Sequence, residues 1–163
     1  MSVDLTVEGA ASAWIDVPAV VQNTAESALT VLGKTDHELS IVLTDDPHIQ
    51  SLNRDFREKD VPTDVLSFGQ LEGEPFVTPV PHLGDLVISL ETAARQAGER
   101  GHPVEAEVRI LLVHGLMHLL GHDHMEPGER ALMAEAEDAL LAALPSHPQW
   151  PTNSGLVSLQ DGK

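Results

Sequence analysis

Cysteine is absent from this chain of 163 residues. Structural zinc sites usually have four ligands rich in cysteine, so that class of site is excluded. Long apolar runs are absent too. The longest, residues 110–121, contains two histidines and is too short to span a bilayer. No basic segment leads into an apolar stretch at the N-terminus, so no secretory signal is expected, and the lack of thiols favours a cytoplasmic protein.

Cationic side chains are scarce: nine Lys and Arg stand against 26 Asp and Glu, a formal net charge of −17. Phosphate affinity comes from Lys and Arg, so a broad nucleic-acid-binding surface is disfavoured. Three of the nine cations, Arg54, Arg57 and Lys59, nevertheless fall within six residues. Such a basic spot can hold a few phosphates, and repulsion elsewhere would favour a nucleic acid presented by a docked partner. The alternative, a solvated helix end, is favoured for Arg54 and Lys59.

Length and patterning predict one α+β domain over residues 1–144. The histidine motif described below predicts that this domain is a metal-dependent hydrolase. Apolar and β-branched segments predict four strands, at residues 3–7, 39–44, 64–68 and 85–89. Start and stop signals predict five helices, at residues 18–32, 47–57, 91–100, 103–120 and 127–144. The fourth helix is apolar on nearly all sides, so we expect a small mixed sheet and the other helices to pack around it.

Two further segments are irregular in sequence. Residues 70–82 contain three prolines and are expected to form either a lid near the site or a passive insertion. Residues 145–163 are expected to form an extended or disordered tail.

Four of the nine histidines fall within residues 114–124. His114 and His118 lie four residues apart and project from one face of a helix. Gly121 allows the chain to leave the helix and return His124 towards them. Three imidazoles leave one tetrahedral position open, as in catalytic zinc sites. His114, His118 and His124 are therefore predicted to bind one Zn²⁺ per chain.

Satisfied polar side chains are the alternative interpretation of these histidines, but burying so many imidazoles without a shared task is unfavourable. His122 and Asp123 directly precede the third predicted ligand, His124. Asp123 either orients a ligand histidine or caps the turn.

The same histidine spacing occurs in metzincin peptidases, which carry Glu directly after the first His as a general base. Here that position is Gly115, so peptide hydrolysis by that mechanism is disfavoured. Zinc can activate water without this carboxylate, so other hydrolytic chemistry stays open. Because no carboxylate on the helix is placed to act as a base, a zinc-activated water is favoured as the nucleophile over a hydroxyl group of the substrate itself.

Three ordered motifs are similar to those of the bacterial YbeY proteins. Residues 53–57 with 63–68, and residues 83–89, resemble two of the family's signatures. The helix motif of the family matches at His114, Gly115, His118, Leu119, Gly121, Asp123 and His124. The departures are His122 for the usual Tyr, Met117 for Leu and Gly69 for a proline.

This resemblance implies a zinc-dependent, single-strand-specific endoribonuclease. It implies action in ribosomal RNA maturation, at the 3′ end of the small-subunit RNA, and in ribosome quality control. Arg57 would be its catalytic residue, neutralising a phosphate or its developing charge. The implied partners are precursor ribosomal RNA, a small-subunit ribosomal protein and a GTPase assembly factor, with no membrane and no DNA.

Two other functions stay open. One is a non-catalytic ribosome assembly factor whose metal only braces the fold. The other is a metzincin-like metallohydrolase, which Gly115 disfavours.

Overall fold

The computed structural model describes residues 2–69, 82–120 and 127–144 of the chain. Its elements, in chain order, are β1 (Ser2–Val7), the short 3-10 helix η1 (Gly9–Ala13), α1 (Val17–Val31), β2 (Glu38–Thr44), α2 (Asp46–Arg57), β3 (Val65–Gly69), β4 (His82–Ser89), α3 (Leu90–Arg100), α4 (Val104–Leu119) and α5 (Pro127–Ala143).

The predicted α+β fold is confirmed, with all four strands and five helices close to their expected positions. The 3-10 helix η1 was not predicted. His82, expected in the irregular segment, begins β4 instead. The rest of that segment, the predicted tail and the predicted break at Gly121 lie outside the described residues.

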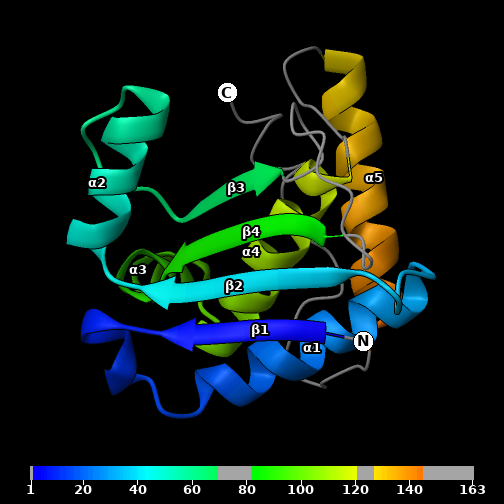
Figure 1. Cartoon of the computed structure of the whole chain (residues 1–163), viewed down its shortest axis with the longest axis horizontal. Coiled ribbons are helices and arrows are strands. Elements are labelled where there is room, and N and C mark those ends of the chain that lie inside the picture. Colours follow the sequence, from blue (N-terminus) through cyan, green and yellow to red (C-terminus); the bar gives the residue numbers. More distant parts are fainter. Residues whose placement is uncertain (1, 70–81, 121–126, 145–163) are drawn as a thin grey trace.

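The four strands form one mixed sheet in the order β1–β2–β4–β3 (Figure 1). β1, β2 and β4 run parallel, whereas β3 pairs antiparallel with β4. Within the described residues β3 has no other strand beside it, so its outer edge is open. An open edge presents backbone carbonyl and amide groups to whatever lies beside it.

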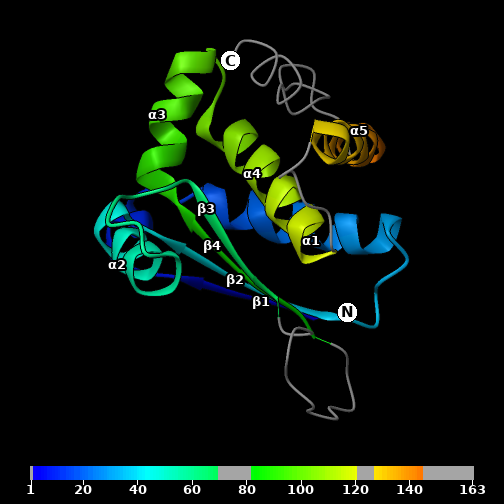
Figure 2. The same cartoon turned by 90° about the horizontal axis from the view of Figure 1, so that it is seen from above.

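The helices cover the sheet unequally. α1, α3, α4 and α5 lie on one face, and α2 lies near the end of the other (Figure 2). α4 contacts α1, α3, α5, β3 and β4, and buried side chains along its length join the main core. The expected central helix is therefore confirmed. No helix in the described part of the chain is both long and apolar enough to cross a bilayer.

Alternate residues of β4 pack into two separate clusters, as strand geometry requires. Leu86 and Ile88 belong to the main core under α4. Val87 points the other way and packs with Ile49 of α2 and Leu66 of β3. This second, smaller cluster holds α2 against the sheet beside the open edge of β3.

Hydrogen bonds at the start of α2 fix its position further. Asp45 caps the helix by accepting a backbone N–H, while Asp46 accepts from Ser89 and Thr92 at 2.6 Å each. Arg95 donates to the other oxygen of Asp46 at 2.8 Å. Burial acts to raise the pKa of Asp46, but these three hydrogen bonds hold that pKa below its ordinary value. The carboxylate therefore ties α2 to the junction between β4 and α3.

Two glycines allow α4 and the edge of the sheet to approach closely. Gly84 has a φ of +146°, and a Cβ there would lie 2.4 Å from the carbonyl oxygen of Phe68. A Cβ on Gly115 would lie 2.8 Å from Leu86 Cδ2, and Ser67 Oγ donates to the Gly115 carbonyl at 3.2 Å. The surface of α4 that carries the histidines is thus held against β3.

Candidate functional site

A cleft of about 690 Å³ follows the open edge of β3, between α2 and α4. Its described lining comes from α2 and the loop after it, from β3, from β4 and from α4. These residues are Asn53, Arg57, Lys59, Thr63, Asp64, Val65, Leu66, Ser67, Phe68, Gly69, Leu83, His114, His118 and Leu119. The cleft therefore brings together motifs that lie about fifty residues apart in the chain.

Two of the predicted metal ligands line this cleft from α4. The rings of His114 and His118 have centroids 4.8 Å apart and meet edge to face at 86°. His124 lies outside the described residues, as do His122 and Asp123. No group of three metal-binding side chains is found among the residues that are described. The three-histidine site therefore stays a prediction.

A carboxylate on α5 holds one of these rings. The Nδ1 atom of His114 lies 2.8 Å from Oε1 of Glu137, whose side chain is fully buried. Histidines that bind metals usually bond their second ring nitrogen to a carboxylate or carbonyl in this way. Asp123 was considered for such a role from the sequence, whereas Glu137 was missed.

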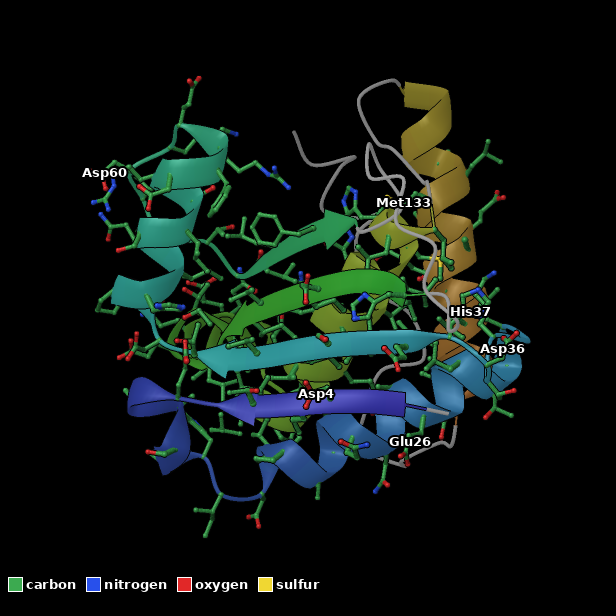
Figure 3. The ribbon with its side chains drawn as sticks, viewed as in Figure 1. Asp4, Glu26, Asp36, His37, Asp60 and Met133 are labelled. Atoms are coloured by element: carbon green, nitrogen blue, oxygen red, sulfur yellow. The ribbon has the colours of Figure 1, made fainter. Side chains whose placement is uncertain are left out.

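The sequence of α5 contains a feature from which the role of Glu137 could have been predicted. Met133, Leu140 and Leu144 are buried at helical spacing, and Glu137 occupies the same stripe. Figure 3 shows Met133 on the side of α5 that meets α4. A carboxylate inside an apolar helical stripe requires a partner on the facing element.

Arg57 enters the cleft from the last turn of α2. Its Nη2 donates to the carbonyl oxygen of Ser67 on the open edge of β3, at 2.7 Å. Its guanidinium carbon lies 5.0 Å from the centroid of the Phe68 ring, within cation–π range. A hydrogen bond and a ring contact therefore hold this cation beside the β3 edge.

The two neighbouring cations differ from each other. Arg54 pairs with Asp55 at 3.1 Å, and both side chains are more than half exposed, as expected of a solvated helix end. Lys59 is exposed too, as expected, and it also lines the cleft with Arg57. Asp64 is the one carboxylate among the described lining residues, so the described lining carries more positive than negative charge.

Both oxygens of Asp64 already accept hydrogen bonds. The backbone N–H of Val65 donates to Oδ1 at 2.7 Å, and Gln96 Nε2 donates to Oδ2 at 3.2 Å. Asp64 thereby joins the start of β3 to α3.

An exposed aromatic ring lies beside Arg57. Phe56 is 60% exposed, although the chain contains only three Phe and two Trp. Its centroid lies 5.5 Å from that of Phe68, with the rings inclined at 71°. Phe56 was not singled out from the sequence, because the direction of a ring at the end of a helix depends on tertiary packing.

The chain is an α+β protein in which a cleft follows the antiparallel edge strand of a mixed four-stranded sheet. Two histidines of its central helix line this cleft. The family model described as endoribonuclease YbeY matches residues 9–145, which include α1 to α5, β2 to β4 and every described residue of the cleft lining. The chain belongs to the YbeY family.

Individual relatives are similar over most of their length. The endoribonuclease YbeY of Carboxydothermus hydrogenoformans is 54% identical over 106 residues, 65% of this chain and 71% of the relative. That of Aquifex aeolicus is 49% identical over 125 residues, 76% of this chain and 81% of the relative. The solution structure of TM1509 from Thermotoga maritima superposes with a TM-score of 0.60 at 25% identity, covering 86% of this chain and 87% of that one.

Proposed function

We propose that this protein is a zinc-dependent endoribonuclease that cleaves single-stranded RNA in the cleft along β3. The observation that carries the proposal is the meeting of Arg57 with His114 and His118 in that one cleft. Hydrolysis of a phosphodiester requires positive charge where negative charge develops. The relatives named endoribonucleases support RNA as the substrate.

The donors in the cleft fit a zinc ion. Imidazole nitrogen is a favoured zinc ligand, and His114 and His118 present neighbouring rings from one turn of α4. Glu137 engages Nδ1 of His114, so zinc would bind that ring through Nε2. His124 would supply the third ligand. When bound, zinc would supply Lewis-acid stabilisation of charge and a more acidic water.

Arg57 would stabilise the phosphate. Its guanidinium has several N–H donors, of which the Ser67 carbonyl takes one. The other N–H groups can donate to a non-bridging phosphate oxygen. Because the bond to Ser67 already holds the side chain in place, little conformational entropy is lost when the phosphate binds. Lys59 adds a second positive charge to the same lining. Both oxygens of Asp64, the one carboxylate of the described lining, already accept hydrogen bonds. A base for the RNA 2′-hydroxyl is therefore less available than a zinc-activated water, and we propose water as the nucleophile.

The charge of the whole chain bears on where this activity is used. The carboxylates labelled in Figure 3, Asp4, Glu26, Asp36 and Asp60, are spread over the molecule, and the net charge is −17. Such a body repels free RNA and attracts basic partners. Membership of the YbeY family supports a use in cytoplasmic ribosomal RNA maturation and ribosome quality control, with a small-subunit ribosomal protein and a GTPase assembly factor as proposed partners. The net charge supports the ribosomal protein among these partners, because such proteins are basic.

The same net charge favours one second candidate, a non-catalytic assembly factor that binds basic ribosomal proteins. A peptidase is not proposed. Metzincins have Glu at the position of Gly115. Here the Cβ of a Glu would lie too close to the side chains of Leu86 and Val65. Close packing of α4 on the sheet is thus a physical reason for glycine at this position.

A substrate panel separates the candidates. The purified protein should cut a labelled single-stranded RNA at internal positions, with much slower cutting of the same sequence in a duplex and none of a peptide. A metal chelator should stop the reaction, and zinc should restore it. If the zinc-loaded protein binds RNA or ribosomal proteins but cuts nothing, the assembly-factor function replaces this one.

Phe56 provides a prediction about single-strand preference. An unpaired base can stack on an exposed aromatic ring, and such stacking contributes about 1–3 kcal/mol per base. Phe56→Ala should therefore weaken binding of single-stranded RNA by about 5-fold or more, with little change for duplex RNA or in melting temperature. Phe56→Trp should retain binding. Fluorescence anisotropy with a non-cleavable RNA measures both, and equal affinities for the Ala variant and the unchanged protein would contradict a stacking role.

A further inference from the structure

A buried carboxylate contacts one of the cleft histidines from outside the cleft. Glu137 is fully buried, and its Oε1 lies 2.8 Å from Nδ1 of His114. No described residue of α5 lines the cleft, so this bond reaches the ring from its far side. Oε2 of Glu137 accepts no hydrogen bond within the described structure. Burying a carboxylate with one oxygen unsatisfied opposes folding, so the residue requires another explanation.

The chemistry of imidazole gives this bond a directional consequence. A neutral imidazole carries its single N–H on either Nδ1 or Nε2, and the other nitrogen has the lone pair that a metal requires. A carboxylate accepts hydrogen bonds, so Glu137 favours the form with N–H at Nδ1. Nε2 then keeps the lone pair.

We propose that Glu137 is a positioning residue for zinc: it fixes the tautomer and the orientation of His114 so that Nε2 binds the metal. The inference rests on the proposed function, because it concerns the metal of that site. Glu137 touches neither substrate nor metal in this assignment and acts only through His114. It also gives α5 a direct role in the cleft that α4 and β3 form.

A second buried glutamate on α4 provides an internal comparison. Glu107 is fully buried, and its Oε1 lies 2.7 Å from Nε2 of His102. Arg100 Nε lies 3.7 Å from the same oxygen. Its Oε2, like that of Glu137, accepts no hydrogen bond within the described structure. Glu107 and His102 are absent from the described cleft lining, however, and a cation accompanies this carboxylate. The Glu107 group is therefore a structural ion-pair cluster, and it offers a matched control for Glu137.

The tautomer can be tested without any substitution. Long-range ¹⁵N–¹H NMR correlations report which ring nitrogen of a neutral histidine carries the proton. In the metal-free protein they should show His114 protonated at Nδ1 and unprotonated at Nε2. Protonation at Nε2 instead would overturn the proposal. This measurement decides the matter even if a variant at position 137 fails to fold.

Zinc affinity, measured by competition with a chromophoric chelator, tests the functional consequence. Glu137→Leu should weaken zinc binding about 10–100-fold, the usual effect of losing such a partner. Glu137→Gln should weaken it less than about 10-fold, because its amide oxygen still accepts from Nδ1–H. Glu107→Gln should lower the melting temperature of the metal-free protein and leave zinc affinity unchanged.

Two outcomes separate this inference from the function on which it rests. If the unchanged protein binds zinc and Glu137→Leu binds it equally tightly, the positioning role is wrong and the proposed enzyme stands. If the unchanged protein binds no zinc, the proposed function itself fails.

Discussion

Replacing His118 with Ala should remove zinc from the protein and lower RNA cleavage by on the order of 100-fold or more. His118 is one of two described imidazoles in the cleft, with its ring 4.8 Å from that of His114. A site with two remaining ligands loses both affinity and geometry. Metal content per chain, measured by mass spectrometry after dialysis, and initial cleavage rates give the result.

His48→Ala is the matched control for His118. His48 lies on α2, is about half exposed and pairs with Glu8 at 2.9 Å, outside the described cleft lining. This variant should keep both its zinc and its cleavage rate. A His118→Ala protein that retains stoichiometric zinc and normal cleavage would remove His118 from the site.

Replacing Arg57 with Ala should lower cleavage by about 100- to 1000-fold, the range expected when a charge-stabilising donor is lost. Zinc content should stay unchanged, because Arg57 is not a ligand. The free energy of unfolding should fall by only about 1 kcal/mol, since an exposed cation–π contact contributes about 0.5–1 kcal/mol. Single-turnover cleavage, metal content and thermal unfolding of the same preparation separate these effects.

Two further arginine variants sharpen this test. Arg54→Ala removes an equal charge from the same helix, but Arg54 pairs with Asp55 outside the described cleft lining. It should therefore cut RNA normally. Arg57→Lys keeps the charge without the planar set of donors and should recover only part of the rate. If Arg54→Ala and Arg57→Ala lose activity equally, net charge rather than a placed guanidinium is responsible.

Periodicity and start signals were sufficient for the four strands and the five α-helices of this fold, but not for η1. The β-branched segments became strands, and the apolar helix that carries the histidines is central, as its pattern predicts. The order β1–β2–β4–β3 could not be predicted in the same way, because strand order depends on long-range pairing. That order determines that β3 lies at an open edge, and the cleft follows this edge.

For the site, local spacing predicted that His114 and His118 lie together, and the structure places both in the cleft. The signature motif singled out Arg57, which lines the same cleft, and its phosphate role stays a prediction. Glu137 was missed because its bond to His114 joins two helices across 23 residues. Lys59 is exposed, as expected, but its place in the cleft lining was not predicted because it depends on the path of the loop that follows α2. In the sequence, Gly115 is notable because it stands where metzincins carry a general base. In the structure, the same glycine allows α4 to pack closely against the sheet.

The central claim is that zinc held by the α4 histidines is required for cleavage of RNA in this cleft. A zinc titration of metal-stripped protein, with the initial cleavage rate of single-stranded RNA as the readout, tests it most directly. We expect almost no cleavage without zinc, and a rate that rises in proportion to added zinc and levels off at one ion per chain. Full cleavage by protein shown to hold no metal, or no cleavage by protein saturated with zinc, would contradict the claim.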